Sequence, residues 1–437
     1  MADREKYEQL AALEEMIVRC YRCGLCRNSC PSFRENGLEG ASPRGRVQLA
    51  KAALEGTLDL KSMASERMLD CLNCMRCADV CPAGVSAGRI VLAARADMVK
   101  DGDLPLVKKL AFNTVLKHPA LLGLASKLGA AGKKIFYDTN ELFTALVPRF
   151  AGMDDKKFPS PVTEQTMDRW PERVKADAGE PIMRVGYFIG CATNLIYPEV
   201  ADATIRVLRH NGVEVVIPRG QACCGIPVYT SGDYANAEKL AKRNRDVFAG
   251  LEIDCIVTDC GSCSAALKHE VEDYVGIKTF DVPVYDINEF LVSQITLKKP
   301  EAAVDMRVTY HDPCHLKRGQ GIWREPREIL TMIPGLELVE MEDADYCCGG
   351  AGAFAYTHHD LSRKVGAPKV DNIRKTGAEH VATPCPSCTM QIEDLLHHEG
   401  LDIPVIHPVT LLDQAYVYND GDEKEAVTIT AAATGDK

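Results

Sequence analysis

The sequence lacks a long uninterrupted apolar run. Its most apolar stretch outside the cysteine motifs, residues 119–131, is interrupted or flanked by Lys117, Lys127, Lys133 and Lys134. It therefore falls short of the ~20 apolar residues that a transmembrane helix needs. The first residues, MADREKYEQL, contain no apolar segment of the kind that a secretory signal requires. We expect a cytoplasmic protein, which can still be peripheral at the inner face of a membrane through a partner.

The sequence also lacks a basic cluster and a nucleotide-binding motif. Its net charge is -11, and no Lys/Arg cluster is dense enough to neutralise a row of phosphates, so nucleic acid is not an expected partner. There is no G-x-G-x-x-G opening a βαβ unit and no Walker A motif. The glycine-rich residues 349–352 follow a cysteine pair and serve that loop. We therefore expect no flavin on this chain.

What the sequence has in abundance is cysteine, with 19 in 437 residues. The chain is too long for the small secreted class that disulfides hold together, and its cysteines are grouped in C-x-x-C units. Metal or cluster ligation is therefore the better interpretation. A chain of this length is expected to form two or three compact domains.

Two complete copies of the motif C-x2-C-x2-C-x3-C-P begin at Cys20 and Cys71. In this spacing, three thiolates on a tight loop bind three corners of a cubane 4Fe-4S cluster, and the fourth, before the proline, binds the other cluster. Zinc fits less well, because structural zinc needs only four ligands, usually as two separated pairs. The predicted ligand sets are Cys20, Cys23, Cys26 and Cys81 for the first cluster, and Cys71, Cys74, Cys77 and Cys30 for the second.

Residues 42–56, between the two motifs, are predicted to turn at Pro43 and continue as a helix. Arg44 and Arg46 near its start have two interpretations. They approach a cluster or the acidic face of a partner, or they belong to a solvated helix start.

The second half of the chain contains an internal repeat. Each copy is predicted to run strand, cysteine, helix, β-rich segment, Cys-Cys-Gly, helix, strand, C-x-x-C, helix and short strand. This alternation predicts parallel sheets in two pseudo-symmetric α/β half-domains. In such sheets, ligand sites lie beyond the carboxyl ends of the strands, where these cysteines fall. The predicted strands include residues 184–190, 213–218, 254–260 and 282–284 in the first copy, and 307–313, 336–341, 380–385 and 403–405 in the second.

Each copy carries five patterned cysteines, which is more than a tetrahedral zinc ion uses. Adjacent cysteines can bridge separate irons of an extended cluster, and the glycine after each pair lets the backbone come close. The alternatives are a structural zinc in one or both copies, or a redox-active disulfide. Cys255 lies outside the pattern and is predicted to belong to the core.

The predicted fold class is α+β with several domains. A helical, bacterial-ferredoxin-like domain occupies residues 1–100, and a helical and Pro-rich linker occupies residues 101–180. The two α/β half-domains occupy residues 181–300 and 301–418. The acidic, then Thr/Ala-rich tail, residues 419–437, is expected to be disordered.

With these motifs the chain resembles the CCG (cysteine-rich) domain family of iron-sulfur oxidoreductases from Cys20 to about Ala415. The layout is similar to the iron-sulfur subunit of glycolate oxidase and D-lactate dehydrogenase and to the fused heterodisulfide reductase subunit, and residues 42–56 favour the glycolate oxidase side. The resemblance implies one or two noncubane 4Fe-4S clusters, with zinc in one repeat as the alternative. The implied ligands are Cys191, Cys223, Cys224, Cys260 and Cys263, and then Cys314, Cys347, Cys348, Cys385 and Cys388.

The function implied is that of the electron-transfer subunit of a flavin-dependent 2-hydroxyacid dehydrogenase complex, of the glycolate or D-lactate type. An FAD-containing subunit would oxidise the substrate, and this chain would relay electrons to a quinone, an electron-transfer flavoprotein or another carrier. It would thus be part of an oxidoreductase without oxidising the substrate itself.

The alternative function is catalysis of disulfide cleavage at the noncubane clusters, as in heterodisulfide reductase. This reaction needs proton donors, and His311 and His315, on either side of Cys314, are the candidates. Their other interpretation is hydrogen bonding to the site, or packing. His358 and His359 are predicted to be surface residues that open a helix. A scaffold with zinc-stabilised repeats is a third interpretation, which the two ferredoxin motifs disfavour.

Overall fold

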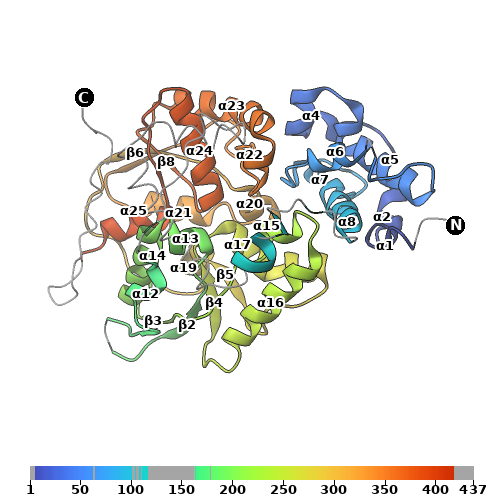
Figure 1. Cartoon of the computed structure of the whole chain (residues 1–437). Helices are drawn as coiled ribbons and strands as arrows, with labels where there is room; N and C mark the ends of the chain where they lie inside the picture. Colours follow the sequence, from blue (N-terminus) through green and yellow to red (C-terminus); the bar gives the residue numbers. More distant parts are fainter. Residues whose placement is uncertain are drawn as a thin grey trace, which may run out of the picture.

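The chain folds as an N-terminal helical part followed by two α/β half-domains (Figure 1). The computed structural model describes residues 5–62, 64–100, 104, 108–109, 111–116, 162, 164–177 and 179–417. Most of the predicted linker and the whole predicted tail lie outside these residues. No helix in the described ranges is long and apolar enough to cross a membrane.

The N-terminal part consists of short helices separated by cysteine loops. Its two longest helices, α5 and α8, pack together and carry much of its core. The predicted helix over residues 42–56 is confirmed as α5, and the Ser42 hydroxyl caps it by accepting a 3.0 Å hydrogen bond from the Gly45 amide. The helices are α1 (Glu8–Ala11), α2 (Glu14–Val18), α3 (Leu25–Ser29), α4 (Pro31–Asn36), α5 (Pro43–Leu54), α6 (Ala64–Leu69), α7 (Arg76–Asp79) and α8 (Ala87–Val99).

The first half-domain is built on a five-stranded sheet in the order β1-β3-β2-β4-β5. The strands β2 to β5 run parallel, as the repeat predicts. The strand β1 pairs antiparallel with β3 and was not predicted, because its two residues fall in the Pro-rich linker. The elements are α12 (Thr166–Arg169), β1 (Arg173–Val174), β2 (Met183–Tyr187), α13 (Cys191–Leu195), α14 (Pro198–His210), β3 (Val213–Val216), α15 (Ile226–Tyr229), α16 (Tyr234–Phe248), β4 (Cys255–Thr258), α17 (Gly261–Ala265), α18 (Val271–Val275), β5 (Val284–Asp286) and α19 (Ile287–Ser293).

The second half-domain repeats this topology with a parallel four-stranded sheet, β7-β6-β8-β9. The matching strand order confirms the predicted pseudo-symmetric repeat. Cys255, on β4, is 3% exposed and belongs to the apolar core, as predicted. The elements are β6 (Met306–Tyr310), α20 (Cys314–Gln320), α21 (Glu325–Met332), β7 (Leu336–Val339), α22 (Phe354–Thr357), α23 (His359–Thr376), β8 (His380–Ala382), α24 (Pro386–His398), β9 (Val405–Ile406) and α25 (Pro408–Ala415).

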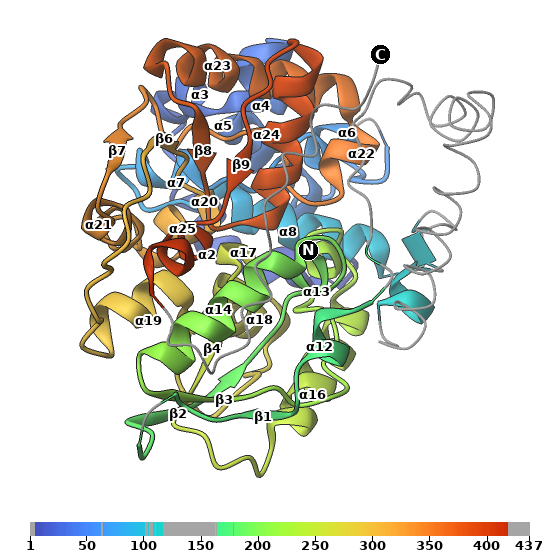
Figure 2. The same cartoon turned by 90° about the vertical axis from the view of Figure 1, so that its left-hand side faces the viewer.

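The half-domains exchange their last helices. The helix α25 of the second half-domain packs on α14 of the first, and α19 of the first packs on α21 of the second. Figure 2 shows these helices between the two sheets. Arg206 on α14 forms an ion pair with Asp413 on α25, with an Nη2 to Oδ2 distance of 2.6 Å. The buried core therefore runs continuously through both half-domains.

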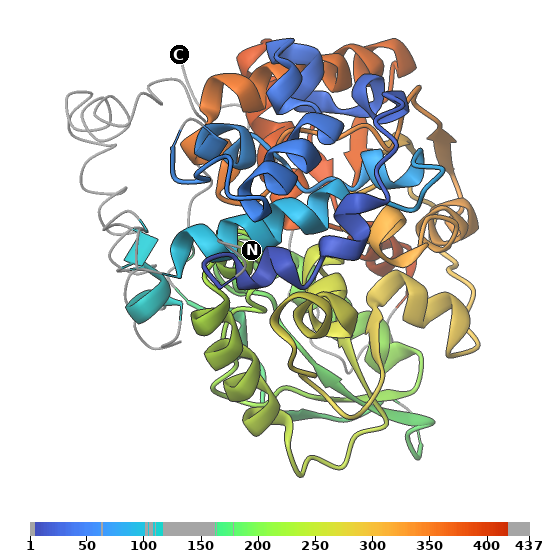
Figure 3. The same cartoon turned by 90° about the vertical axis from the view of Figure 1, so that its right-hand side faces the viewer.

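The N-terminal part lies against both half-domains. Figure 3 shows its blue to cyan helices across the front of the molecule. The helices α4 and α7 contact α23 and α20 of the second half-domain, and α8 contacts α18 of the first. Arg318 on α20 forms a 2.7 Å ion pair with Asp79 on α7. The cysteine loops of the N-terminal part are thereby brought next to the cysteines of the repeats.

Candidate metal centres

The first predicted ligand set surrounds one small cavity of about 30 Å³, which Cys20, Cys23, Cys26 and Cys81 all line. The helix α2 ends just before Cys20, and the loop turns through Arg22 and Gly24, which have φ angles of 57° and 88°. Cys81 comes from the second motif, after α7. Four sulfur atoms around one cavity form a donor set that suits a thiophilic metal cluster.

The second predicted set is more deeply buried. Cys30 is 6% and Cys74 is 9% exposed. Burial raises the pKa of the Cys30 thiol, and the neighbouring Cys74 and Cys71 raise it further. Burial likewise raises the pKa of Cys77, which is close enough to the other three to feel their charge. Thiols packed this way ionise readily only when a metal binds the thiolates, so this donor set also fits a cluster.

Arg46 lies against the second set. Approach to a cluster was one of the two interpretations of the arginines in residues 42–56. Its side chain is 2% exposed, and its Nη1 donates to the Cys30 sulfur at 3.7 Å. Its Nη2 donates to the Ser32 hydroxyl at 3.0 Å. The solvated interpretation is therefore wrong for Arg46, because its guanidinium is enclosed between Cys30, Ser32 and the Arg67 carbonyl. Arg44 is part-exposed and donates to Glu39 at 2.7 Å.

Arg95 lies beside the same set and was not singled out from the sequence. It is 7% exposed and donates from Nη2 to the Cys71 carbonyl at 2.7 Å and from Nη1 to the Thr230 carbonyl at 2.8 Å. It thereby ties the second cysteine loop to the first half-domain. An available signal was its position within residues 90–96, where it is the one charged residue in an otherwise apolar and buried run.

The five cysteines of the first repeat converge at the carboxyl ends of β2 and β4, as predicted. The pair Cys223 and Cys224 precedes Gly225, whose φ of 97° favours glycine. The Cys263 sulfur lies 3.3 Å from the Cys224 sulfur, and the Cys263 amide donates to the Cys260 sulfur at 3.4 Å. The five cysteines are Cys191, Cys223, Cys224, Cys260 and Cys263, and all of them line one cavity.

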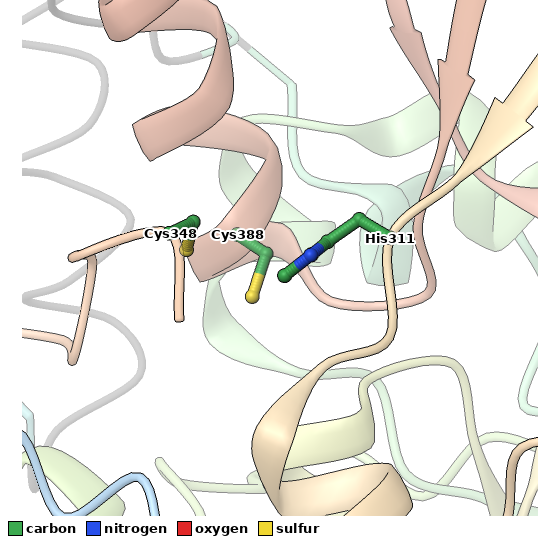
Figure 4. A group of neighbouring side chains, drawn as sticks. All are labelled: His311, Cys348 and Cys388. Carbon is green, nitrogen blue, oxygen red and sulfur yellow. The ribbon is translucent and has the colours of Figure 1, made fainter. Parts of the chain in front are cut away.

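The second repeat gathers its five cysteines in the same way, and adds a histidine. Donor atoms of His311, Cys348 and Cys388 lie within 4.8 Å of one another. Figure 4 shows them converging from β6, from the Cys-Cys-Gly loop and from α24. The five cysteines are Cys314, Cys347, Cys348, Cys385 and Cys388. All nineteen cysteines lie within the described residues and none of them forms a disulfide.

The two predicted proton donors both line the cavity, but with different partners. The Nδ1 atom of His311 is 3.1 Å from the Ala344 carbonyl, so Nδ1 carries a proton and Nε2 is the nitrogen left for the cysteines. In His315, Nδ1 lies 3.4 Å from the Cys314 sulfur and Nε2 lies 3.6 Å from the buried Glu270 carboxylate.

The prediction for His358 and His359 is partly wrong. The helix α23 does begin at His359. However, His359 is only 8% exposed and is therefore not a surface residue. His358, the residue before this helix, lines the cavity.

The metal sites adjoin one another. The thiols of Cys74 in the second set and Cys347 in the second repeat interact directly. The Cys260 thiol of the first repeat interacts with Cys385 of the second, and the Ser262 hydroxyl lies 3.3 Å from the Cys385 sulfur. One cavity of about 420 Å³ reaches Cys71 and all ten repeat cysteines. These contacts order three of the sites as second set, second repeat, first repeat. The first set adjoins the second, because Cys26 is near enough to raise the pKa of Cys77.

The chain matches two protein-family models. A 4Fe-4S dicluster domain matches residues 16–85, and a cysteine-rich domain, CCG, matches residues 185–268 and 308–393. The dicluster domain implies two cubane 4Fe-4S clusters, and the cysteine groups of the two CCG repeats indicate further metal or iron-sulfur sites.

Three relatives illustrate the likeness. The chain is 35% identical over 402 residues to a subunit of the fumarate reductase (CoM/CoB) of Methanothermobacter marburgensis, covering 91% of this chain and 72% of that one. It is 30% identical over 430 residues to a probable glycolate oxidase iron-sulfur subunit of Bacillus subtilis, covering 92% and 94%. It is 31% identical over 239 residues to a lactate utilization protein of Halalkalibacterium halodurans, covering 53% and 97%. The chain therefore belongs to the CCG family and is an iron-sulfur subunit of a CCG-type oxidoreductase.

Proposed function

We propose that this chain is the electron-transfer subunit of a flavin-dependent 2-hydroxyacid dehydrogenase complex, of the glycolate or D-lactate type. The observation that carries the proposal is the unbroken series of cysteine sites, which begins at the exposed Cys23 and ends in the cavity between the repeats. The glycolate oxidase and lactate utilization relatives support the substrate class. The FAD-containing subunit oxidises the hydroxyacid, and a quinone, an electron-transfer flavoprotein or another carrier accepts the electrons. The complex is cytoplasmic, or peripheral at the inner face of the membrane.

The ligand sets of this proposal are those that the cysteine motifs predict. Cys20, Cys23, Cys26 and Cys81 hold one cubane cluster, and Cys71, Cys74, Cys77 and Cys30 hold the other. Each group of five repeat cysteines holds a noncubane 4Fe-4S cluster, with zinc in one repeat as the alternative. When bound, these clusters supply one-electron transfer.

The other residues of the chain position and shield these sites. Arg95 holds the Cys71 loop against Thr230 of the first half-domain. Arg46 places a buried positive charge beside Cys30. Burial of the second set excludes water, which lowers the local dielectric and lengthens the reach of such a charge.

The first experiment measures iron, acid-labile sulfide and zinc per chain on anaerobically purified protein, together with its EPR spectrum. We expect about sixteen irons, four for each of four clusters. About eight irons with stoichiometric zinc would mean that the repeats bind structural zinc and do not take part in electron transfer. An anaerobic pull-down from the native host should recover a flavoprotein that oxidises glycolate or D-lactate. Recovery of a clean, flavin-free chain that reduces disulfides by itself would refute the dehydrogenase assignment.

A second function, disulfide cleavage, is favoured by one observation. The cavity of about 420 Å³ opens onto both repeats at once, so that one small molecule can contact both cysteine groups. Reduction of a disulfide to two thiols consumes two electrons and two protons. His315, whose Nε2 faces Glu270, is better placed to pass on a proton than His311, whose Nδ1 proton is held by Ala344.

This second function is tested by mixing the dithionite-reduced chain with a small mixed disulfide and counting the thiols released in repeated turnovers. Thiol release that His315→Gln slows at an unchanged iron content would support it. Thiol release no faster than that of dithionite alone would exclude it.

A further inference from the structure

The two ferredoxin motifs have the same local backbone conformation. Arg22 and Asn73, each just before the second cysteine of its motif, have φ angles of 57° and 51°. Gly24 and Met75, each just after that cysteine, have φ angles of 88° and 59°. The two loops are therefore equivalent, and the residue after the first cysteine in each motif has the same place on its loop. These residues are Tyr21 in the first motif and Leu72 in the second.

The equivalent faces of the two loops differ in what covers them. Leu72 is 4% exposed and packs, together with Cys74, against Cys347, Phe354 and Val365 of the second half-domain. This contact brings the second ligand set next to the cysteines of the second repeat. An apolar residue at this position of the loop thus packs against the part of the protein that carries the neighbouring cysteine site.

The face of the first loop is open to solvent. Tyr21 is 80% exposed, and Cys23 is exposed as well. Leu25 is 61%, Val18 is 57% and Val80 is 41% exposed. Tyr21 and Leu25 line the first cavity, and Val18 and Val80 are within two residues of Cys20 and Cys81, which line it too. These are four of the ten large hydrophobic residues that the described chain exposes. Exposed apolar side chains that gather around one site mark an interaction surface rather than ordinary surface scatter.

The charge of this face indicates the partner. Arg22 lines the mouth of the first cavity and Arg19 is exposed beside it, and neither pairs with an acidic side chain in the described part of the chain. The nearby Glu39 is engaged by both Arg27 and Arg44. The face is thus positive on a chain whose net charge is -11. Arg22 also keeps a left-handed conformation that is uncommon for a residue with a side chain.

We propose that the Tyr21 face, formed by Val18, Tyr21, Arg22, Leu25 and Val80, is the docking site of an acidic one-electron carrier protein. The carrier places its redox group opposite Cys23, as the second half-domain places Cys347 opposite Cys74. The carrier is oxidised by one electron and the first cubane is reduced by one, or the reverse, and no bond forms or breaks. This inference rests on the proposed function, because it requires a cluster at the first ligand set.

The test uses the full chain with its clusters and a flavodoxin as the acidic carrier. Stopped-flow absorbance follows cluster reduction by reduced flavodoxin, and calorimetry measures the affinity for oxidised flavodoxin. We expect Arg22→Glu to slow reduction at low salt and to weaken binding, each about tenfold or more. The difference should shrink in high salt, because a charge at the rim of an interface acts through screened attraction. Tyr21→Ser should weaken binding at every salt concentration. Reduction by the small methyl viologen radical should be unchanged in both variants.

Two matched variants far from this face provide the controls. Ile182→Ser removes a hydrophobic side chain that is 62% exposed, and Arg245→Glu reverses a charge that is 43% exposed. The proposal is overturned if Arg22→Glu behaves like Arg245→Glu, or if wild-type protein does not bind flavodoxin. It is also overturned if the wild type, but neither face variant, sediments with phosphatidylglycerol vesicles, which would assign the face to a membrane. Absence of the first cluster from the iron count and EPR spectrum would instead refute the proposed function.

Discussion

Replacement of Arg46 by glutamine is expected to lower the reduction potential of the second cubane. The Arg46 guanidinium is buried and lies 3.7 Å from the Cys30 sulfur. It forms no ion pair with a carboxylate in the described residues. A buried charge of this kind requires compensation, and the thiolates of the second set are the nearest negative groups. The positive charge favours the reduced cluster, which carries one more electron.

The size of the effect follows from the distance. Two unit charges about 4 Å apart interact by about 4 kcal/mol at an effective dielectric constant near 20. The added electron spreads over the whole cluster, so we expect roughly half of this, or ~2 kcal/mol. Since about 1.4 kcal/mol is a factor of ten, the ratio of reduced to oxidised cluster should fall about 25-fold at a fixed potential. With ~59 mV for each factor of ten in a one-electron couple, this is about 80 mV.

The assay is an EPR-monitored redox titration of the wild type, Arg46→Gln, Arg46→Lys and Arg44→Gln, at matched iron contents. Arg46→Lys keeps the positive charge, so the reduction potential of its second cubane should stay close to the wild-type value. Arg44→Gln removes a charge next to the first set and should leave the second cluster unchanged. If Arg46→Gln keeps a full second cluster with the wild-type potential, the assignment of Arg46 as its counter-charge is refuted.

Three further predictions concern stability. Gly349→Ala should lower the free energy of unfolding by about 3 kcal/mol in chemical denaturation and deplete iron from the second repeat. The reason is that the new Cβ would lie 2.3 Å from the Ser362 carbonyl oxygen, at a φ of 87°. Gly400→Ala is the control, because Gly400 also has a positive φ, of 68°, but its new Cβ would meet no atom within 4 Å. Arg95→Ala should lower the free energy of unfolding by about 3 kcal/mol, because it leaves buried carbonyl groups without a hydrogen-bond donor. In limited proteolysis, the N-terminal part should be released earlier from Arg95→Ala than from Arg95→Lys. Burial raises the pKa of Glu199 to about 7, above an unfolded value of about 4.3, so stability should fall by up to about 3 kcal/mol between about pH 4 and 7. The melting temperature of Glu199→Gln should therefore depend less on pH over this range than that of the wild type. Equal dependence on pH in the two proteins would contradict the raised pKa of Glu199.

The sequence predicted much of the architecture because its signals are local. Strand and helix alternation predicted the parallel strands, and the helix after Pro43 was found where expected. The short strand at Arg173–Val174 was missed, because it exists only through its pairing with the open edge of β3. The burial of His359 was also missed. A polar residue that opens a helix gives no sign of what the rest of the fold places over it.

The cysteine spacing by itself determined only which ligands lie side by side on one loop, such as Cys20, Cys23 and Cys26, because the backbone of a short loop holds them together whatever surrounds them. That Cys81 of the other motif lines the same cavity depends on the tertiary structure. Only the tertiary structure decided how the sites relate. The contact of Cys74 with Cys347 and that of Cys260 with Cys385 join residues far apart in the chain. The same holds for the burial of Arg46 and the exposure of Tyr21. Two nearly identical loops acquired opposite surroundings because the second half-domain packs over one of them and leaves the other open.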